Sequence, residues 1–333
     1  MAMNRLKLSI GLLLALLTIS CQKSMNSEEI YNECASGVVL IVNNFYYSVT
    51  LPTDEKIFFT GVDRNGELTG LTFNEDEARQ NQSGCTGTGF FISTDGQIMT
   101  NRHVASPEID KADVKAFLKG YKKLVKNYYK EKMDQMRVEY FKYQGTAYEE
   151  RIVQAYDHYN KQLEMVDDMD MNDADIETHT RLNIIYNDSH VVKAEDLKPC
   201  ITVAVSEEED VDLAIIQLED ATTPTESHVF SLAESDDPLT LDQKLFMIGY
   251  NYGFNLATTA QGIKSQMYTG NVTQKTDGVR QLYSISSLPG SSGSPVIDEY
   301  GHLVAVHFAG MSSTQNFNYG IPSKKIRQFL QEN

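Results

Sequence analysis

The sequence predicts a mainly β protein, a barrel or sandwich of short strands, interrupted once by a helical hairpin. Short apolar runs rich in β-branched residues recur along most of the 333-residue chain, with turn-forming residues between them. Between about residues 107 and 168 this pattern stops. Apolar residues recur there at the three- and four-residue steps of an amphipathic helix instead.

The predicted strands share a run of apolar residues bounded by Gly, Asp, Asn or Pro. They cover residues 36–42, 87–93, 97–100, 182–186, 201–205, 213–218, 244–249, 282–285, 295–297 and 303–308. Residues 50–84 mix short apolar pieces with polar ones and predict a hairpin or a long loop. Asp95-Gly96 is a hairpin-turn signal, and the strand after it leads into His103. A short amphipathic helix over 321–330 closes the chain.

Two helices are predicted between the strands. Ser106-Pro107 supplies a capping residue and a proline at the first helical position. The apolar stripe then runs to Gln144-Gly145, which breaks it, and a second stripe covers 146–166. Helices joined by so short a break form an antiparallel hairpin.

The charges of this predicted hairpin are segregated along the chain. Residues 111–144 hold ten Lys and Arg against four Asp and Glu, whereas residues 164–177 are acidic. The two runs are either solvated faces that complement each other or a docking arm. An arm of this kind would take a protein partner, a membrane surface or an acidic substrate.

The N-terminus has the pattern of an export signal. Arg5 and Lys7 precede an apolar run that ends at Ser20, which predicts a signal peptide over residues 1–20. The pattern before Cys21 resembles a bacterial lipobox, which implies that Cys21 is lipidated; Thr18 departs from that pattern, so plain secretion stays open. Residues 21–35 are polar and predict a tether. The expected location is the cell envelope, in the periplasm or at the outer membrane.

Charge and cysteine content exclude some classes of function. A formal net charge of −17 argues against a general nucleic-acid binder. Cys34, Cys85 and Cys200 remain after Cys21, and an oxidising compartment would allow one disulfide, for which Cys34–Cys85 is preferred. Since no Cys-x-x-Cys pair occurs, a structural zinc site is not expected.

Three distant segments together suggest nucleophilic catalysis. Ser292 stands in a Gly-Ser-Ser-Gly turn, and a serine hydroxyl needs an adjacent base at neutral pH. His103, at the end of a predicted strand, is the candidate base. Asp212, directly before another strand, could fix the tautomer of that base. Asp210 and Ser291 are the competing carboxylate and hydroxyl, and Ser291 lacks a glycine directly after it.

The flanks of these residues resemble the trypsin-like serine peptidases of bacteria. The resembling stretches are Gly87-Thr-Gly-Phe-Phe-Ile, Thr100-Asn-Arg-His-Val, Asp212-Leu-Ala-Ile-Ile, Gly290-Ser-Ser-Gly-Ser-Pro-Val, Gly301-His-Leu-Val-Ala-Val-His-Phe-Ala-Gly310 and Tyr319-Gly-Ile-Pro. The chain looks nearest to the glutamyl-endopeptidase (V8-like) group and next to the HtrA/Deg group, without a PDZ domain. The resemblance implies a chymotrypsin-like double β-barrel over residues 36–106 and 176–333, with the helical hairpin inserted at 107–175.

The resemblance also implies a chemistry. A serine endopeptidase of this family hydrolyses peptide bonds in polypeptides and needs no cofactor or metal. The implied catalytic residues are His103, Asp212 and Ser292, with the backbone N–H groups of Gly290 and Ser292 as the oxyanion hole. Losing one oxyanion donor typically costs about 100- to 1,000-fold in rate.

Three further residues would line the specificity pocket by the same resemblance. His307 takes the position of a pocket histidine in glutamyl endopeptidases, and Ser287 aligns with a small hydroxyl residue of that pocket. A hydroxyl and an imidazole can bind a carboxylate, which suggests cleavage after acidic residues. Ser286 aligns with the base of the pocket, where trypsin-like digestive enzymes hold an aspartate, so a strong preference for Lys or Arg is not expected. His307 could equally be a packed core histidine. Two other functions stay open: a catalytically silent binding or adhesion lipoprotein acting through the helical insert, and an esterase with the same triad.

Overall fold

The computed structural model describes residues 23–190, 193, 196–233, 238–310 and 317–333. The predicted signal peptide over residues 1–20 and the predicted lipidation site Cys21 lie outside these residues. None of the helices in the described ranges is both long enough and apolar enough to cross a membrane.

Six antiparallel strands close the first barrel. Their order around the barrel is β1 (Val38–Thr50), β5 (Ser83–Phe91), β6 (Gln97–Thr100), β9 (Ala214–Leu218), β8 (Lys198–Val205) and β7 (Asp175–Tyr186). The barrel closes because β7 pairs back with β1, with Ile41 opposite Ile184. Successive residues of a strand point to opposite faces, so alternate positions such as Val39 and Ile41 pack with Phe91 in one buried cluster.

The second barrel is a six-stranded curled sheet. Its order is β13 (Gln266–Asn271), β10 (Lys244–Gly249), β15 (Pro295–Ile297), β16 (Leu303–Gly310), β17 (Asn318–Pro322) and β14 (Gln281–Tyr283). A bridge between Val272 and Tyr283 joins its two edges. The C-terminal helix α8 (Ser323–Glu332) contributes Ile326 and Phe329 to the core. Between β10 and β13 lie a short helix, α7 (Phe254–Ala257), and the small pair β11 (Thr258–Thr259) and β12 (Gly262–Ile263).

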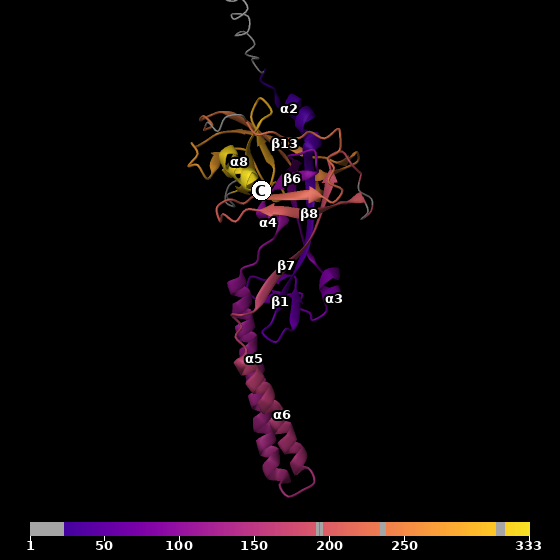
Figure 1. Ribbon diagram of the computed structural model, residues 1–333, viewed down its shortest axis with the longest axis vertical. Coiled ribbons are helices and arrows are strands. Elements are labelled where there is room, and N and C mark those ends of the chain that lie inside the picture. The colour runs from indigo at the N-terminus through magenta and orange to yellow at the C-terminus, as the bar shows by residue number, and fades with distance from the viewer. Residues whose placement is uncertain (1–22, 191–192, 194–195, 234–237, 311–316) are drawn as a thin grey trace, which may run out of the picture.

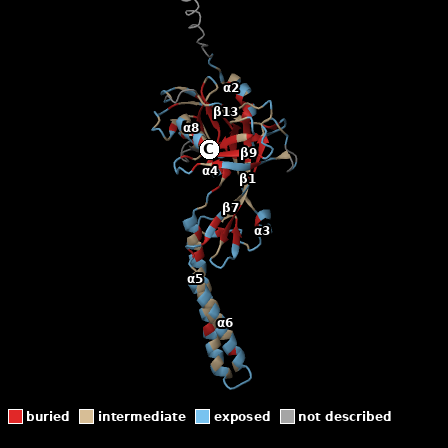
Figure 2. Ribbon diagram, viewed as in Figure 1, coloured by how far each residue is buried: buried red, intermediate tan, exposed pale blue. Residues whose placement is uncertain are grey.

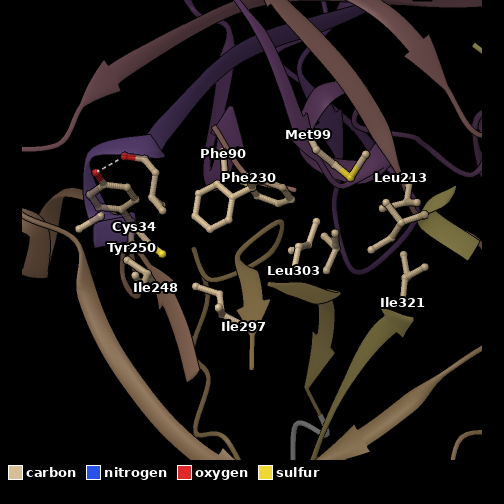
Figure 3. Packing of buried hydrophobic residues seen from close by; sticks show 14 of the residues in the cluster. Cys34, Phe90, Met99, Leu213, Phe230, Ile248, Tyr250, Ile297, Leu303 and Ile321 are labelled. Carbon is tan, nitrogen blue, oxygen red and sulfur yellow. Dashed lines mark hydrogen bonds between the residues drawn. The ribbon is translucent and has the colours of Figure 1, made fainter. Parts of the chain in front are cut away.

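The two barrels share a hydrophobic cluster, part of which Figure 3 draws. Phe90 and Met99 come from the first barrel, and Ile248 and Ile297 come from the second; all four are fully buried. Complete burial of such a side chain stabilises the fold by about 1.5–3 kcal/mol. Tyr250 adds a polar link, because its hydroxyl donates to the Val38 carbonyl at 3.1 Å. This shared core fixes the barrels against each other, and the predicted chymotrypsin-like double barrel is confirmed.

The predicted helical hairpin is present. Helices α5 (Lys111–Tyr143) and α6 (Glu149–Asp168) project from the barrels, and Figure 2 shows them exposed along most of their length. The predicted start at Ser106-Pro107 is wrong. A short helix, α4 (Arg102–Ala105), ends there, and Asp110 caps α5 through a 2.7 Å bond from the Ala112 amide.

The charge runs of the hairpin partly neutralise each other. Lys126 of α5 forms an ion pair with Asp167 of α6. Lys122 Nζ donates to the carbonyls of Asp167 and Met169 at 2.9 and 2.6 Å. Where these contacts lie, they favour the first of the two interpretations, in which the basic and acidic runs are solvated faces that complement each other.

A small subdomain, part of which the sequence predicts as a hairpin or a long loop over residues 50–84, anchors the helical hairpin. Strands β1 and β7 run past the barrel and meet β2 (Lys56–Phe59), β3 (Gly61–Val62), β4 (Leu68–Thr69) and α3 (Glu75–Gln80). Tyr47, Phe59 and Leu68 pack there with Val114 and Leu118 of α5. In Figure 1 this subdomain lies between the barrels and the hairpin.

The predicted tether over residues 21–35 is wrong for its later part. Ser27–Cys34 form helix α2, and a single 3-10 turn (Ala35–Gly37) joins it to β1. Asn26 caps α2 in a capping box with Glu29. The apolar side of α2 is short, but Ile30 and Cys34 are fully buried in the core shared by the barrels.

The preferred disulfide between Cys34 and Cys85 is also wrong, because both residues and Cys200 are free thiols. Cys34 ends α2 in the shared core, whereas Cys85 lies on β5 opposite Asn43. Burial raises the pKa of Cys34 and of Cys200 to about 12 and that of Cys85 to about 11. The three thiols are therefore protonated and unreactive at neutral pH.

Candidate active site

His103 and Asp212 are brought together by strand pairing. Strand β6 ends at Thr100, which pairs with Ala214 at the start of β9. The residues just beyond these ends therefore lie side by side. His103 Nδ1 is 2.6 Å from Asp212 Oδ2, and the His103 backbone amide donates to Asp212 Oδ1 at 3.0 Å. Both oxygens of the carboxylate are thus committed to one residue.

The two side chains differ in exposure in the way a catalytic pair requires. The Asp212 side chain is 18 % exposed, whereas His103 is 49 % exposed and open to a substrate. Asn101, which is fully buried, supports the pair because its Nδ2 donates to the Asp212 carbonyl at 2.7 Å. Asn101 was not among the residues expected from the sequence, although it lies two positions before His103.

The turn that carries Ser292 packs against the strand leading to His103. The Thr88 amide of β5 donates to the Ser292 carbonyl at 2.8 Å. Gly293 has φ +86°, and a Cβ at this position would lie 2.1 Å from the Thr88 carbonyl and 2.4 Å from Thr100 Oγ1. Only glycine fits such an approach. The glycine after Ser292 therefore lets the turn sit directly on β5 and on the end of β6.

The backbone N–H groups expected to form the oxyanion hole have no acceptor within the described residues. The Tyr252 amide donates to the Pro289 carbonyl at 2.6 Å, which fixes the orientation of the Pro289–Gly290 peptide. Because a trans amide directs its N–H opposite to its C=O, the Gly290 N–H points away from Tyr252. Neither the Gly290 N–H nor the Ser292 N–H donates a hydrogen bond to any other residue that the structure describes.

Thr88 is a second site residue that sequence reasoning missed. Its hydroxyl donates to the Gly290 carbonyl at 2.8 Å and accepts from the Tyr250 amide at 3.0 Å. With the bond from its amide to Ser292, this buried threonine holds both ends of the turn. The signal was its place in the Gly-Thr-Gly run of β5, but its partners are more than 160 residues away in sequence.

The competing hydroxyl and carboxylate are engaged elsewhere. Ser291 is 2 % exposed, and its Oγ donates to the Leu288 carbonyl at 2.7 Å within the turn. Asp210 forms an ion pair with Arg280 at 2.9 Å. Ser292 is partly exposed, and its Oγ makes no hydrogen bond within the described chain. Catalytic bonds of this kind are often long in a free enzyme and tighten when substrate binds.

The pocket candidates gather around β14, β16 and β17. His307 is 2 % exposed, and its Nδ1 lies 2.8 Å from Tyr283 Oη. Ser287 Oγ donates to Asn318 Oδ1 at 2.7 Å, so its proton is already used. Ser286 lies beside Ser287 and is partly exposed. His307 is thus largely buried in this structure, with one ring nitrogen paired to Tyr283.

His307 should make stability depend on pH. Burial, and secondarily the charge of nearby His103, lowers the pKa of His307 from 6.5 to about 3. The unfolded chain then takes up a proton near pH 6.5 that the native state refuses until about pH 3. The native state therefore loses stability as pH falls through this window, by at most about 1.4 kcal/mol per pH unit.

We expect His307→Gln to flatten the fall in free energy of unfolding over that window, measured by urea unfolding at several pH values. His158→Gln, on the exposed side of α6, is the matched control and should keep the wild-type slope. An unchanged slope in His307→Gln would show that this histidine is not held neutral by the fold.

A family comparison agrees with the fold. The model of the trypsin-like peptidase domain family matches residues 87–306 of this chain. The chain therefore belongs to the trypsin-like peptidases, a family of serine-type endopeptidases.

Two known proteins are similar to this chain. "Protease Do-like 5, chloroplastic" of Arabidopsis thaliana is 32% identical over 118 residues, which are 32% of this chain and 35% of the relative. The chain thus spans about a third of the length of this curated relative. The crystal structure of the serine endoprotease from Yersinia pestis aligns over 93% of this chain and 67% of its own, with 12% identity and a TM-score of 0.47. The resemblance to the trypsin-like serine peptidases is confirmed by the family match. The likeness to the glutamyl-endopeptidase and HtrA/Deg groups stays a prediction.

Proposed function

We propose that the chain is a serine endopeptidase that hydrolyses polypeptides through Ser292, His103 and Asp212. The observation that carries this proposal is the 2.6 Å contact between His103 Nδ1 and Asp212 Oδ2, in a histidine whose side chain is 49 % exposed. That contact holds the Nδ1–H tautomer and leaves Nε2 free to accept a proton. An arrangement retained only for structure would have no need of an exposed imidazole.

The proton transfers of the proposed reaction follow from this tautomer. As Ser292 Oγ attacks the scissile carbonyl, its proton passes to His103 Nε2, and Asp212 stabilises the imidazolium. The negative oxygen of the tetrahedral intermediate accepts from the N–H groups of Gly290 and Ser292. His103 then gives its proton to the leaving amine, and an acyl group stays on Ser292. Water, deprotonated by His103, releases the acid and restores the hydroxyl.

Casein and short acyl esters distinguish the peptidase from an esterase. We expect the purified chain to cleave casein, because an extended peptide can use the barrels on both sides of the site. Hydrolysis of acyl esters with no cleavage of casein would instead support the esterase. Inertness toward both would support a silent binding protein.

We further propose a preference for acidic residues before the scissile bond. With Nδ1 of His307 paired to Tyr283, the other ring nitrogen can donate to a substrate carboxylate while the ring stays neutral. Because the Ser287 hydroxyl already donates to Asn318, the proposed preference depends on the His307 imidazole. A mixed peptide library should be cut mainly after Glu. Cleavage mainly after Lys, Arg or Val would remove this proposal, and His307→Phe should abolish the Glu preference if it holds.

We also propose that the protein is exported and carries a lipid anchor at Cys21. In Figure 1, α2 and the helical hairpin lie at opposite ends of the described molecule. A lipid just before α2 would therefore direct the hairpin away from the membrane, where it could meet a protein partner.

Palmitate should label the wild-type chain and not Cys21→Ala, and equal labelling of both would contradict the anchor. Deleting residues 108–175 should leave labelling intact while removing any partner recovered by crosslinking.

A further inference from the structure

Arg102, the residue directly before His103, holds the loop that carries Asp212. This loop covers residues 206–213, between β8 and β9. Arg102 Nη1 donates to the carbonyls of Ser206 and Glu208, each at 3.1 Å, and Nη2 donates to the Glu209 carbonyl at 3.2 Å. The Arg102 side chain is 17 % exposed. Because these three hydrogen bonds end on main-chain oxygens, they fix the path of the loop backbone, whereas an ion pair to a side chain would only offset its charge.

The loop needs such an anchor because its sequence opposes a compact turn. It reads Ser-Glu-Glu-Glu-Asp-Val-Asp, and four adjacent carboxylates repel one another. A guanidinium offers planar, fixed donors that match several carbonyls at once, which a lysine ammonium does not. Arg102 therefore supplies both positive charge and a fixed geometry at the point where the loop approaches His103.

Two other cations reach the same loop in a different way. Arg280 pairs with the Asp210 carboxylate, and Lys325 pairs with the Glu208 carboxylate at 2.6 Å. Both contacts end on side chains, and both carboxylates are more than half exposed. Exposed ion pairs of this kind contribute little. Substituting Arg280 or Lys325 is therefore a control for Arg102, because it removes a positive charge beside the loop but no hydrogen bond to the loop backbone.

We infer that Arg102 is a positioning residue, which sets the loop so that the Asp212 carboxylate meets both the amide and the ring of His103. This inference rests on the proposed peptidase function. Asn101, Arg102 and His103 then act as consecutive contacts to one loop: the first binds the Asp212 carbonyl, the second binds the carbonyls before it, and the third binds the carboxylate. A displacement of about 1 Å in such a site can cost about 100-fold in rate.

Steady-state kinetics on the whole chain tests the role of Arg102. Arg102→Met keeps the aliphatic stem and removes the donors. It should lower kcat by about 10- to 100-fold while KM stays within about twofold. Arg102→Lys should recover part of the loss. Arg280→Gln, the matched control, should keep the wild-type kcat. If Arg102 acts through Asp212, Arg102→Met should cause no further loss in an Asp212→Asn background.

A readout that needs no activity separates this inference from the peptidase proposal. In Ser292→Ala protein, the Nδ1 proton shared by His103 and Asp212 should give a low-field proton NMR signal. Arg102→Met should broaden or remove that signal, and Arg280→Gln should preserve it. The inference is overturned if Arg102→Met keeps the signal, or if its kcat loss persists in full in Asp212→Asn. Should Arg102→Met fail to fold, Arg102→Lys decides, because an unchanged kcat and signal would contradict the role of the guanidinium.

Discussion

Ser292→Ala should lower kcat/KM for peptide hydrolysis by about 10⁴-fold or more, measured on casein or a cleaved peptide. The variant removes the hydroxyl that we propose forms the acyl intermediate, while the proposed oxyanion donors remain. Stability should change little, because Ser292 Oγ makes no hydrogen bond within the described chain. The effect is therefore expected in kcat and not in the free energy of unfolding.

Ser291→Ala is the matched control for this result. Ser291 is the neighbouring serine, but its hydroxyl already donates a hydrogen bond to the Leu288 carbonyl. We expect it to retain activity within about tenfold and to lose about 1 kcal/mol of stability with that bond. An inactive Ser291→Ala beside an active Ser292→Ala would reassign the nucleophile.

Asp212→Asn should lower kcat by about 10⁴-fold with the fold intact. The amide is similar in size, so the loop and the contact to the His103 amide can persist. However, an amide NH₂ facing Nδ1 would favour the tautomer that carries its proton on Nε2. The imidazole could then no longer accept the proton of Ser292. The measurement is kcat from single-substrate kinetics, with circular dichroism to verify folding.

Asp210→Asn distinguishes this tautomer effect from a general loss of negative charge. Asp210 lies two residues before Asp212 on the same loop and pairs with exposed Arg280 instead of His103. Its substitution should change kcat by less than about threefold, because exposed ion pairs contribute little. Equal losses in the two variants would mean that the charge of the loop, and not the bond to Nδ1, matters.

Strand periodicity predicted the elements that carry the site. The strands at 97–100, 244–249 and 295–297 have their predicted bounds, because each is a buried run ended by clear turn residues. The helical hairpin was predictable because each of its two helices carries a long apolar stripe with helical spacing. Local pattern is sufficient where one segment determines its own structure.

The elements that were missed depend on distant partners. Helix α2 has too few apolar residues to stand out, and only the shared barrel core makes Ile30 and Cys34 a buried face. Strands β3 and β4 have two residues each, which is too short for any periodicity. Thr88 and Arg102 act on backbone groups more than 100 residues away, and sequence carries no local sign of such bonds.

Fluorophosphonate labelling followed by peptide mapping tests the central claim most directly, because the reagent reacts only with a serine that an adjacent base activates. We expect one adduct on Ser292 in the wild-type chain, its retention in Ser291→Ala, and a large drop in labelling rate in His103→Ala. A folded wild-type chain that takes up no reagent, or that takes it up at another residue, would contradict the assignment of Ser292 as the nucleophile.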